Sequence, residues 1–149
     1  MHPYLLEASA TTRALYLMGF DESRGAIRTF KLQRILDLSL APETFEPPHS
    51  GVVQEGLDRA WGVIADQEEV EVVLRFDAAI AGQVTETTWH PTERVVPEPE
   101  GSVVWRARVP GTIEIRRWIL SWGSEVEVLE PPELRDEVAA THRAAAARY

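Results

Sequence analysis

Two adjacent prolines, Pro47 and Pro48, constrain the fold more than any other feature of the chain. Neither can donate a backbone hydrogen bond to a sheet ladder, and a proline also disfavours helix at the residue before it. The 149 residues are enough for one ordinary domain or two small ones. We therefore expect three parts: a first unit over residues 1–48, a linker helix over 49–67, and a second unit over 68–149.

The first unit reads as short strands joined by tight turns. Residues 14–20 form an apolar run that is typical of a strand buried on both faces, and Gly25 suits the hairpin loop that follows. From Leu36 onward, apolar and polar residues alternate as in a half-buried strand. The four expected strands cover residues 3–9, 14–20, 26–31 and 34–40. They predict a small β-barrel, which would be marginal alone and would pack on a neighbour or a second copy of itself.

The rest of the chain alternates between helical and strand patterns. The linker helix follows Ser50 as N-cap, with Val53, Leu57, Trp61 and Ile64 on one face. Strands are expected over 70–76, 92–96, 102–109 and 125–129. Asp77 and Thr112 are the expected N-caps of two helices, and Pro131 opens a terminal helix. This order predicts a split βαβ, or ferredoxin-like, second unit and an α+β chain overall.

Charge limits which partners the chain can bind. The net charge is −9, from 15 basic and 24 acidic residues. Residues 1–46 hold five bases and six acids, which leaves ten bases and eighteen acids for the remainder. This balance argues against non-specific binding of duplex DNA by the whole chain, because phosphate neutralisation needs a basic face. An anionic ligand would need a local basic pocket.

One such basic segment lies at Ile27–Ile35, where Arg28, Lys31 and Arg34 fall within seven residues. They are interleaved with Phe30, Leu32 and Ile35. Guanidinium groups match phosphate oxygens in pairs, and arginine also stacks on bases. The alternative is that these are surface charges on a barrel edge. In a continuous strand, Arg28 and Arg34 would lie on one face and Lys31 on the other. A turn near Leu32 would therefore be needed to bring all three side chains together.

Other classes of function find little support. The chain has no cysteine, which excludes disulfides, thiolate chemistry and cysteine zinc sites and fits a reducing cytoplasm. It has no apolar run of the ~18 residues that a membrane helix needs, and no signal-peptide pattern at its start. The four histidines lack metal-ligand spacing, and no glycine-rich phosphate loop is present. We expect no catalysis, no metal and no cofactor.

Several motifs together resemble a known pair of domains. Tyr16-Leu17, the run Arg28–Ile35 and Phe45-Glu46-Pro47 resemble a WYL domain. The pair Arg75-Phe76, Trp89-His90-Pro91 and the tail from Trp118 to Arg135 resemble the WCX extension that commonly follows it. Leu15 stands where the family signature begins with tryptophan, which weakens any role for that ring in stacking on a ligand.

The resemblance implies the effector-sensing part of a bacterial transcriptional regulator. It implies a Sm-like or SH3-like barrel for the first unit, a homodimer, and a single-stranded nucleic acid or nucleotide as effector. The helix-turn-helix domain of such regulators is absent from this chain, and the sequence leaves open whether Met1 is a natural start or a truncation.

The candidate ligand-binding residues are Arg28, Arg34, Lys31, Tyr16, Arg75, Ser9 and Tyr4. Tyr16 is equally well placed to be core, and Arg75 to form a salt bridge with one of the many acids. Trp89 and His90 are expected to pack at a corner and to orient the backbone. The competing function is a ligand-free dimerisation or docking module, in which Arg28 and Arg34 pair with acids on a neighbouring chain.

Overall fold

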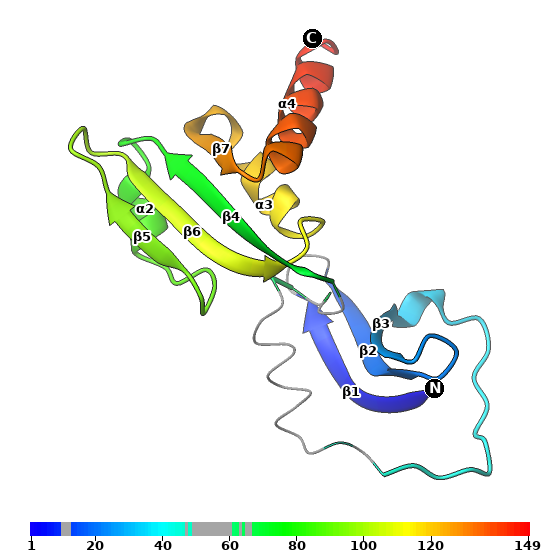
Figure 1. Ribbon diagram of the computed structural model, residues 1–149. Helices are drawn as coiled ribbons and strands as arrows, with labels where there is room; N and C mark the ends of the chain where they lie inside the picture. Colours follow the sequence, from blue (N-terminus) through cyan, green and yellow to red (C-terminus); the bar gives the residue numbers. More distant parts are fainter. Residues whose placement is uncertain (10–12, 47, 49–60, 63, 65–66) are drawn as a thin grey trace. The chain divides into compact units, whose positions relative to one another are not determined.

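The computed structural model describes residues 1–9, 13–46, 48, 61–62, 64 and 67–149. They belong to two compact units, Met1–Gln67 and Glu68–Tyr149 (Figure 1). Each unit is built on one antiparallel sheet, and the α-helices that the structure describes all belong to the second unit. The chain is thus a mixed α+β protein, as predicted.

The first unit holds a three-stranded sheet in the order β1-β2-β3. Its strands are β1 (His2–Ser9), β2 (Ala14–Asp21) and β3 (Ala26–Lys31). The β2–β3 hairpin turns at Asp21, whose carboxylate accepts hydrogen bonds from the backbone N–H and the hydroxyl of Ser23 at 3.0 and 2.6 Å. Gly25 then takes a φ of +63°, a conformation that favours glycine. The turn chemistry therefore fixes the hairpin that the sequence predicted.

The predicted strand over residues 34–40 is wrong. The chain instead makes a 3₁₀ turn at Leu32–Arg34 and then runs without regular structure to Leu40. Leu36, Leu38 and Leu40 are 99%, 80% and 101% exposed. Alternating residues form a strand only where a neighbouring strand supplies hydrogen bonds, and no described residue does so here. The sheet of this unit is open in its described part, and it forms no closed barrel there.

The second strand also differs from its prediction. The run 14–20 was expected to be buried on both faces, yet Leu15 is 40% exposed. Only Ala14, Met18 and Gly19 are buried in β2. The described part of this unit provides too little apolar surface to cover both sides of its central strand.

The linker helix predicted for residues 49–67 falls mostly outside the described residues. Of the residues assigned to its apolar face, Val53 and Leu57 are not described. Trp61 lies in a bend, and Ile64 has no regular structure.

The second unit has the predicted order of strand, helix, strand, strand, helix, strand and terminal helix (Figure 1). Its sheet has the order β5-β6-β4-β7, with every neighbouring pair antiparallel. The strands are β4 (Glu69–Phe76), β5 (Arg94–Pro97), β6 (Val103–Pro110) and β7 (Val126–Glu130). The helices are α2 (Ala81–Thr85), α3 (Ile115–Ser121) and α4 (Pro132–Ala146), and a 3₁₀ turn at Gly123–Glu125 precedes β7.

Helix starts in this unit differ in detail from the sequence prediction. The N-caps are Ile80 and Glu114 instead of Asp77 and Thr112, and neither makes a side-chain capping bond. Asp77 and Thr112 contribute backbone carbonyls instead, which accept hydrogen bonds from the first turns of α2 and α3. A glycine ends this stretch of helix, because Gly123, which follows the C-cap Trp122, adopts a φ of +62°.

The most completely buried residues of β4 and β6 lie on one face of the sheet, which forms the core, although Val73 on the other face of β4 is also buried at 8% exposure. On β4, Val72, Leu74 and Phe76 are fully buried, and β6 buries its odd-numbered residues in the same way. Phe76 meets Trp118 and Trp122 edge-on, with ring centroids 5.7 and 5.5 Å apart. Trp118 of α3 and Trp122, the residue after this helix, therefore pack against the core residue Phe76. The exposed Arg106 and Arg108 of β6 lie on the opposite face of the sheet.

Candidate functional site

The basic segment of the first unit lies on strand β3 and in the turn that follows it. Arg28 is exposed in mid-strand, Lys31 ends the strand, and Arg34 is exposed in the 3₁₀ turn. Successive strand residues point to opposite faces, so Arg28 and Lys31 lie on different faces of the sheet. The turn expected near Leu32 is present at Leu32–Arg34. It follows Lys31 and does not bring this side chain to the face of Arg28.

Lys31 belongs to a polar row across the sheet. It lies directly opposite Tyr16, which in turn lies opposite Glu7 on β1. Directly opposed residues share a face, so the tyrosine ring is flanked by a base and an acid. Ser9 pairs with Ala14 on the same face and is 9% exposed. Lys31, Tyr16 and Ser9 thus form one group among the candidates.

Arg28 belongs to the other face, where a cavity of about 330 Å³ lies beside it. Arg28 and Thr29 of β3 line this cavity together with Ile64 and Gln67. The residue opposite Arg28 is Gly19, and any side chain there would collide with the backbone oxygen of His2. The volume lies at the low end of the range for small-molecule sites. Arg28 is the one predicted ligand residue among the described residues that line it.

Tyr4 sits at an irregularity of β1. The register shifts between Pro3 and Leu5, so Tyr4 is the extra residue of a bulge. Its ring lies 6.0 Å from that of Phe45, which also stacks on His2 at 4.5 Å. Phe45 thereby holds the end of the WYL-like segment against β1. The candidate ligand-binding residues of the first unit therefore lie on both faces of its sheet and at the bulge of β1.

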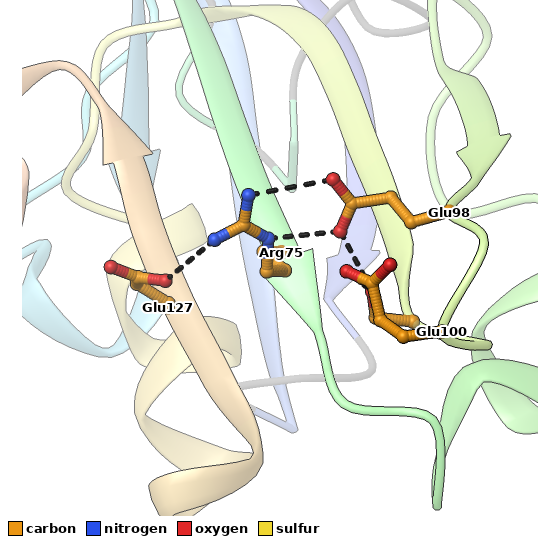
Figure 2. Close-up of polar contacts among 5 residues, drawn as sticks. Arg75, Glu98, Glu100 and Glu127 are labelled. Carbon is orange, nitrogen blue, oxygen red and sulfur yellow. Dashed lines mark hydrogen bonds and ion pairs between the residues drawn. The ribbon is translucent and has the colours of Figure 1, made fainter.

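Arg75 of β4 belongs to the second unit and is already paired with acids (Figure 2). Its Nε lies 2.9 Å from Glu98 Oε2, its Nη2 lies 3.4 Å from Glu98 Oε1, and its Nη1 lies 3.3 Å from Glu127 Oε2. The Ser102 hydroxyl donates to Glu98 Oε2 at 2.7 Å and lies 3.2 Å from Glu100 Oε1. Arg75 was expected either to bind a ligand or to form a salt bridge. In the structure it forms salt bridges with Glu98 and Glu127.

This network shifts the proton affinities of both ionised partners. The Ser102 hydroxyl, followed by the Arg75 guanidinium, lowers the pKa of Glu98 below its usual value. The hydrogen bonds and the charge of Glu98 raise the pKa of Arg75 further above its already high value. Arg75 would have to exchange these carboxylates for a phosphate before it could bind a ligand.

Glu93 accepts three hydrogen bonds that hold a corner of the second unit, a role that the sequence did not reveal. Its Oε2 accepts hydrogen bonds from the backbone N–H of Trp89, the backbone N–H of His90 and the indole N–H of Trp105, at 2.9, 3.2 and 2.8 Å. His90 is 2% exposed, and its Nδ1 lies 2.9 Å from the Thr92 hydroxyl. The corner predicted at Trp89-His90 is thus held by an acid three residues beyond it.

Two further features concern the part of the chain that the structure describes: metal ligands and membrane-spanning helices. No group of three or more histidine or carboxylate side chains is placed there to hold a metal ion. None of the helices described is long and apolar enough to cross a membrane.

Comparison with known proteins identifies both units. Residues 68–146 match the family model of the WCX domain, and residues 1–40 match that of the WYL domain. No curated protein matches the chain. Among solved structures, it is similar to proteasome accessory factor B/C (PafBC) of Arthrobacter aurescens, with 23% sequence identity and a TM-score of 0.46. That alignment covers 99% of this chain and 22% of PafBC, so the chain spans about a fifth of that protein's length. The chain belongs to the family of proteins in which a WYL domain is followed by a WCX domain.

Proposed function

We propose that this chain is the effector-sensing region of a bacterial transcriptional regulator and binds a single-stranded nucleic acid or a nucleotide through its WYL unit. The observation that carries the proposal is the cationic segment of β3 and its turn, with a cavity beside Arg28, in a chain of net charge −9. Membership of the WYL and WCX family supports it. The chain acts by binding, without catalysis or a cofactor.

The sheet geometry ranks the proposed contacts. Arg28 is the main anchor because it lines the cavity, and Arg34 adds a second phosphate contact from the adjoining turn. Lys31, Tyr16 and Ser9 form a second group on the opposite face, with Tyr4 at the bulge of β1. Arg75 ranks last because its guanidinium is held by Glu98 and Glu127.

The proposal also includes a specific fold for each of the two units. The strand order β5-β6-β4-β7, with a helix after β4 and another after β6, supports a ferredoxin-like arrangement for residues 68–149. For residues 1–48 we propose part of a Sm-like or SH3-like barrel, joined to the second unit by a linker helix over 49–67. A full-length relative would add a helix-turn-helix domain and form a homodimer.

The decisive experiment is fluorescence anisotropy of a labelled single-stranded oligonucleotide. We expect saturable binding that weakens about seven-fold between 50 and 200 mM salt, the dependence expected for two phosphate contacts on a single strand. The variant Arg28→Ala/Arg34→Ala should lose binding. Arg13→Ala/Arg24→Ala, which removes the same charge from the same unit, should retain it. Equal loss in both variants, or no binding by the folded parent chain, would contradict the proposal.

A second candidate function is partner docking, and the exposed leucines favour it. Leu36, Leu38 and Leu40 alternate along one segment and are almost fully exposed, and Leu6 and Leu15 of the neighbouring sheet are 55% and 40% exposed. Exposed apolar side chains gathered in contiguous patches mark interaction sites, and five exposed leucines in one small unit supply the material for such a patch. The alternation would place the three leucines on one side of a strand if a second copy supplied a pairing edge.

Sedimentation velocity tests this docking function. The variant Leu36→Ser/Leu38→Ser/Leu40→Ser should weaken self-association more than tenfold, because burying each leucine contributes about 1.5–3 kcal/mol. Ile113→Ser removes an exposed apolar side chain, 51% exposed, from the second unit and serves as the control. A parent chain that stays monomeric at high concentration would exclude docking to a second copy.

A further inference from the structure

We propose that the exposed sheet face of the WCX unit carries a separate binding site for a small phosphorylated molecule, formed by Arg94, Arg106 and Arg108. This site is independent of the WYL segment and does not rest on the function proposed above. The register of strands β5 and β6 brings the three arginines together.

Three arginines meet at one end of this face. Arg94 of β5 lies directly opposite Arg106 of β6, and Arg108 follows two residues along the same strand. Directly opposed residues have neighbouring side chains on one face, and residues two apart on a strand share that face. All three side chains are exposed, and the intervening Ala107 faces the core at 3% exposure. The register therefore groups three guanidinium groups on the solvent side of the sheet.

None of these three side chains forms an ion pair or hydrogen bond with any described residue. Like charges directly opposite each other on a sheet are destabilising. The chain has 24 acids for 15 bases, so acidic partners are abundant. On the same face of the sheet, Arg75 does receive two carboxylates, from Glu98 and Glu127. Arg108 has an acid, Glu71 of β4, directly opposite it but forms no ion pair with it, whereas Arg94 and Arg106 lie opposite each other. Among the described residues, these arginines therefore remain without the ion pair that the fold gives to Arg75.

The arginines line a groove of about 630 Å³. Its other walls come from the loop before β5, at Pro91, Thr92 and Glu93, and from Glu71 of β4. The Thr92 hydroxyl fixes the wall by donating to the Arg108 carbonyl at 3.0 Å and accepting from the Arg108 N–H at 2.9 Å. Oε2 of Glu93 is held by three N–H donors. The groove is thus bounded by backbone that is tied in place.

The chemistry of the groove selects the ligand class. Adjacent guanidinium forks match the oxygens of a phosphate or pyrophosphate group. Glu71 and Glu93 leave the lining with three positive and two negative charges, so a long polyanion gains little from it. No aromatic side chain lines the groove in the described part of the chain, whereas binding of single strands relies on base stacking. The lining therefore suits a compact phosphate group better than a nucleic-acid strand.

The test is a titration of the ¹⁵N-labelled full chain with sodium pyrophosphate at constant ionic strength, followed by NMR. We expect saturable shifts of the backbone amides at 92–94 and 106–108 and of the side-chain Nε–Hε groups of the three arginines. Arg94→Gln/Arg106→Gln should weaken binding at least tenfold. Arg117→Gln, which removes an exposed charge from α3 of the same unit, should bind as the parent does. Shifts that rise linearly without saturation, or that weaken equally in the control, would overturn the proposal.

Two further measurements separate this site from the alternatives. Arg28→Ala/Arg34→Ala should leave the pyrophosphate shifts unchanged, so failure of the WYL site and failure of this one are distinguishable. Without ligand, Arg106→Gln should melt at the same temperature as the parent or higher, because it removes a like-charge contact. A lower Tm would show that Arg106 is structural. Shifts at 92–94 and 106–108 with an oligonucleotide but not with pyrophosphate would replace the small phosphate by a strand and overturn the assignment of ligand class.

Discussion

A single acid, Glu98, stabilises the second unit through its ionised carboxylate. The pKa of Glu98 is below its usual value of 4.5, first because of the Ser102 hydroxyl and then because of Arg75. A lowered folded-state pKa means that the carboxylate stabilises the fold above pH 4.5, and this contribution is lost as pH falls through the lowered pKa. Glu98→Gln should therefore lower Tm relative to the parent at pH 6, and the gap should close below pH 4. Circular dichroism melts from pH 3 to 7 would measure it, and a gap independent of pH would contradict this account.

Glu93 stabilises the fold at the same scale by a different mechanism, because its donors are buried. Trp105 is fully buried and His90 is 2% exposed, so removing the carboxylate takes away a hydrogen-bond acceptor that these buried N–H groups use. Each buried polar group left unsatisfied costs about 1–3 kcal/mol. We expect Glu93→Ala to lower the free energy of unfolding by at least that much in urea titrations. Glu86→Ala, at an exposed position after α2, should change it little. Comparable values for the two variants would contradict this role.

At the scale of elements, the sequence predicts strands well where alternation is matched by a partner within the chain. Val70–Phe76 alternates, and β4 forms with Val72, Leu74 and Phe76 buried because β6 and β7 pair with it on both sides. The same pattern at 36–40 forms no strand, because strand formation depends on a neighbouring edge that local sequence does not reveal.

How much of the candidate site could be predicted depends on the same difference. Local sequence patterns are visible in the chain, whereas contacts between distant residues are not. The basic spacing at Arg28, Lys31 and Arg34 was visible in the sequence, and strand parity correctly separated Lys31 from Arg28. Glu93 was not found, because an acid between Thr92 and Arg94 looks solvated until Trp105, twelve residues away, is known to donate to it. Arg94 and Arg106 became a pair only through the register of β5 and β6.

At the scale of the whole molecule, the two units differ sharply in how much core they contain. Among the described residues, the buried hydrophobic side chains of the first unit are Ala14 and Met18. The second unit buries fifteen, including Phe76, Trp105 and Ile119. Stability rises with apolar area removed from water, at about 25 cal/mol per Å². The WCX unit therefore holds most of the hydrophobic stabilisation that the described structure contains.

This difference in buried core predicts how stable each unit is when it is expressed alone. Residues 68–149 expressed alone should fold cooperatively and melt close to the main transition of the full chain, because their sheet and helices bury one another. Residues 1–67 alone should lack a cooperative transition, since the described part of this unit, a three-stranded open sheet with exposed leucines, buries too little apolar surface to offset chain entropy. Circular dichroism and calorimetry of both fragments would measure this. If the first fragment melts cooperatively only at high concentration, self-association through the exposed leucines supplies the missing core; if it does so at every concentration, the WYL unit is stable without a partner and the prediction fails.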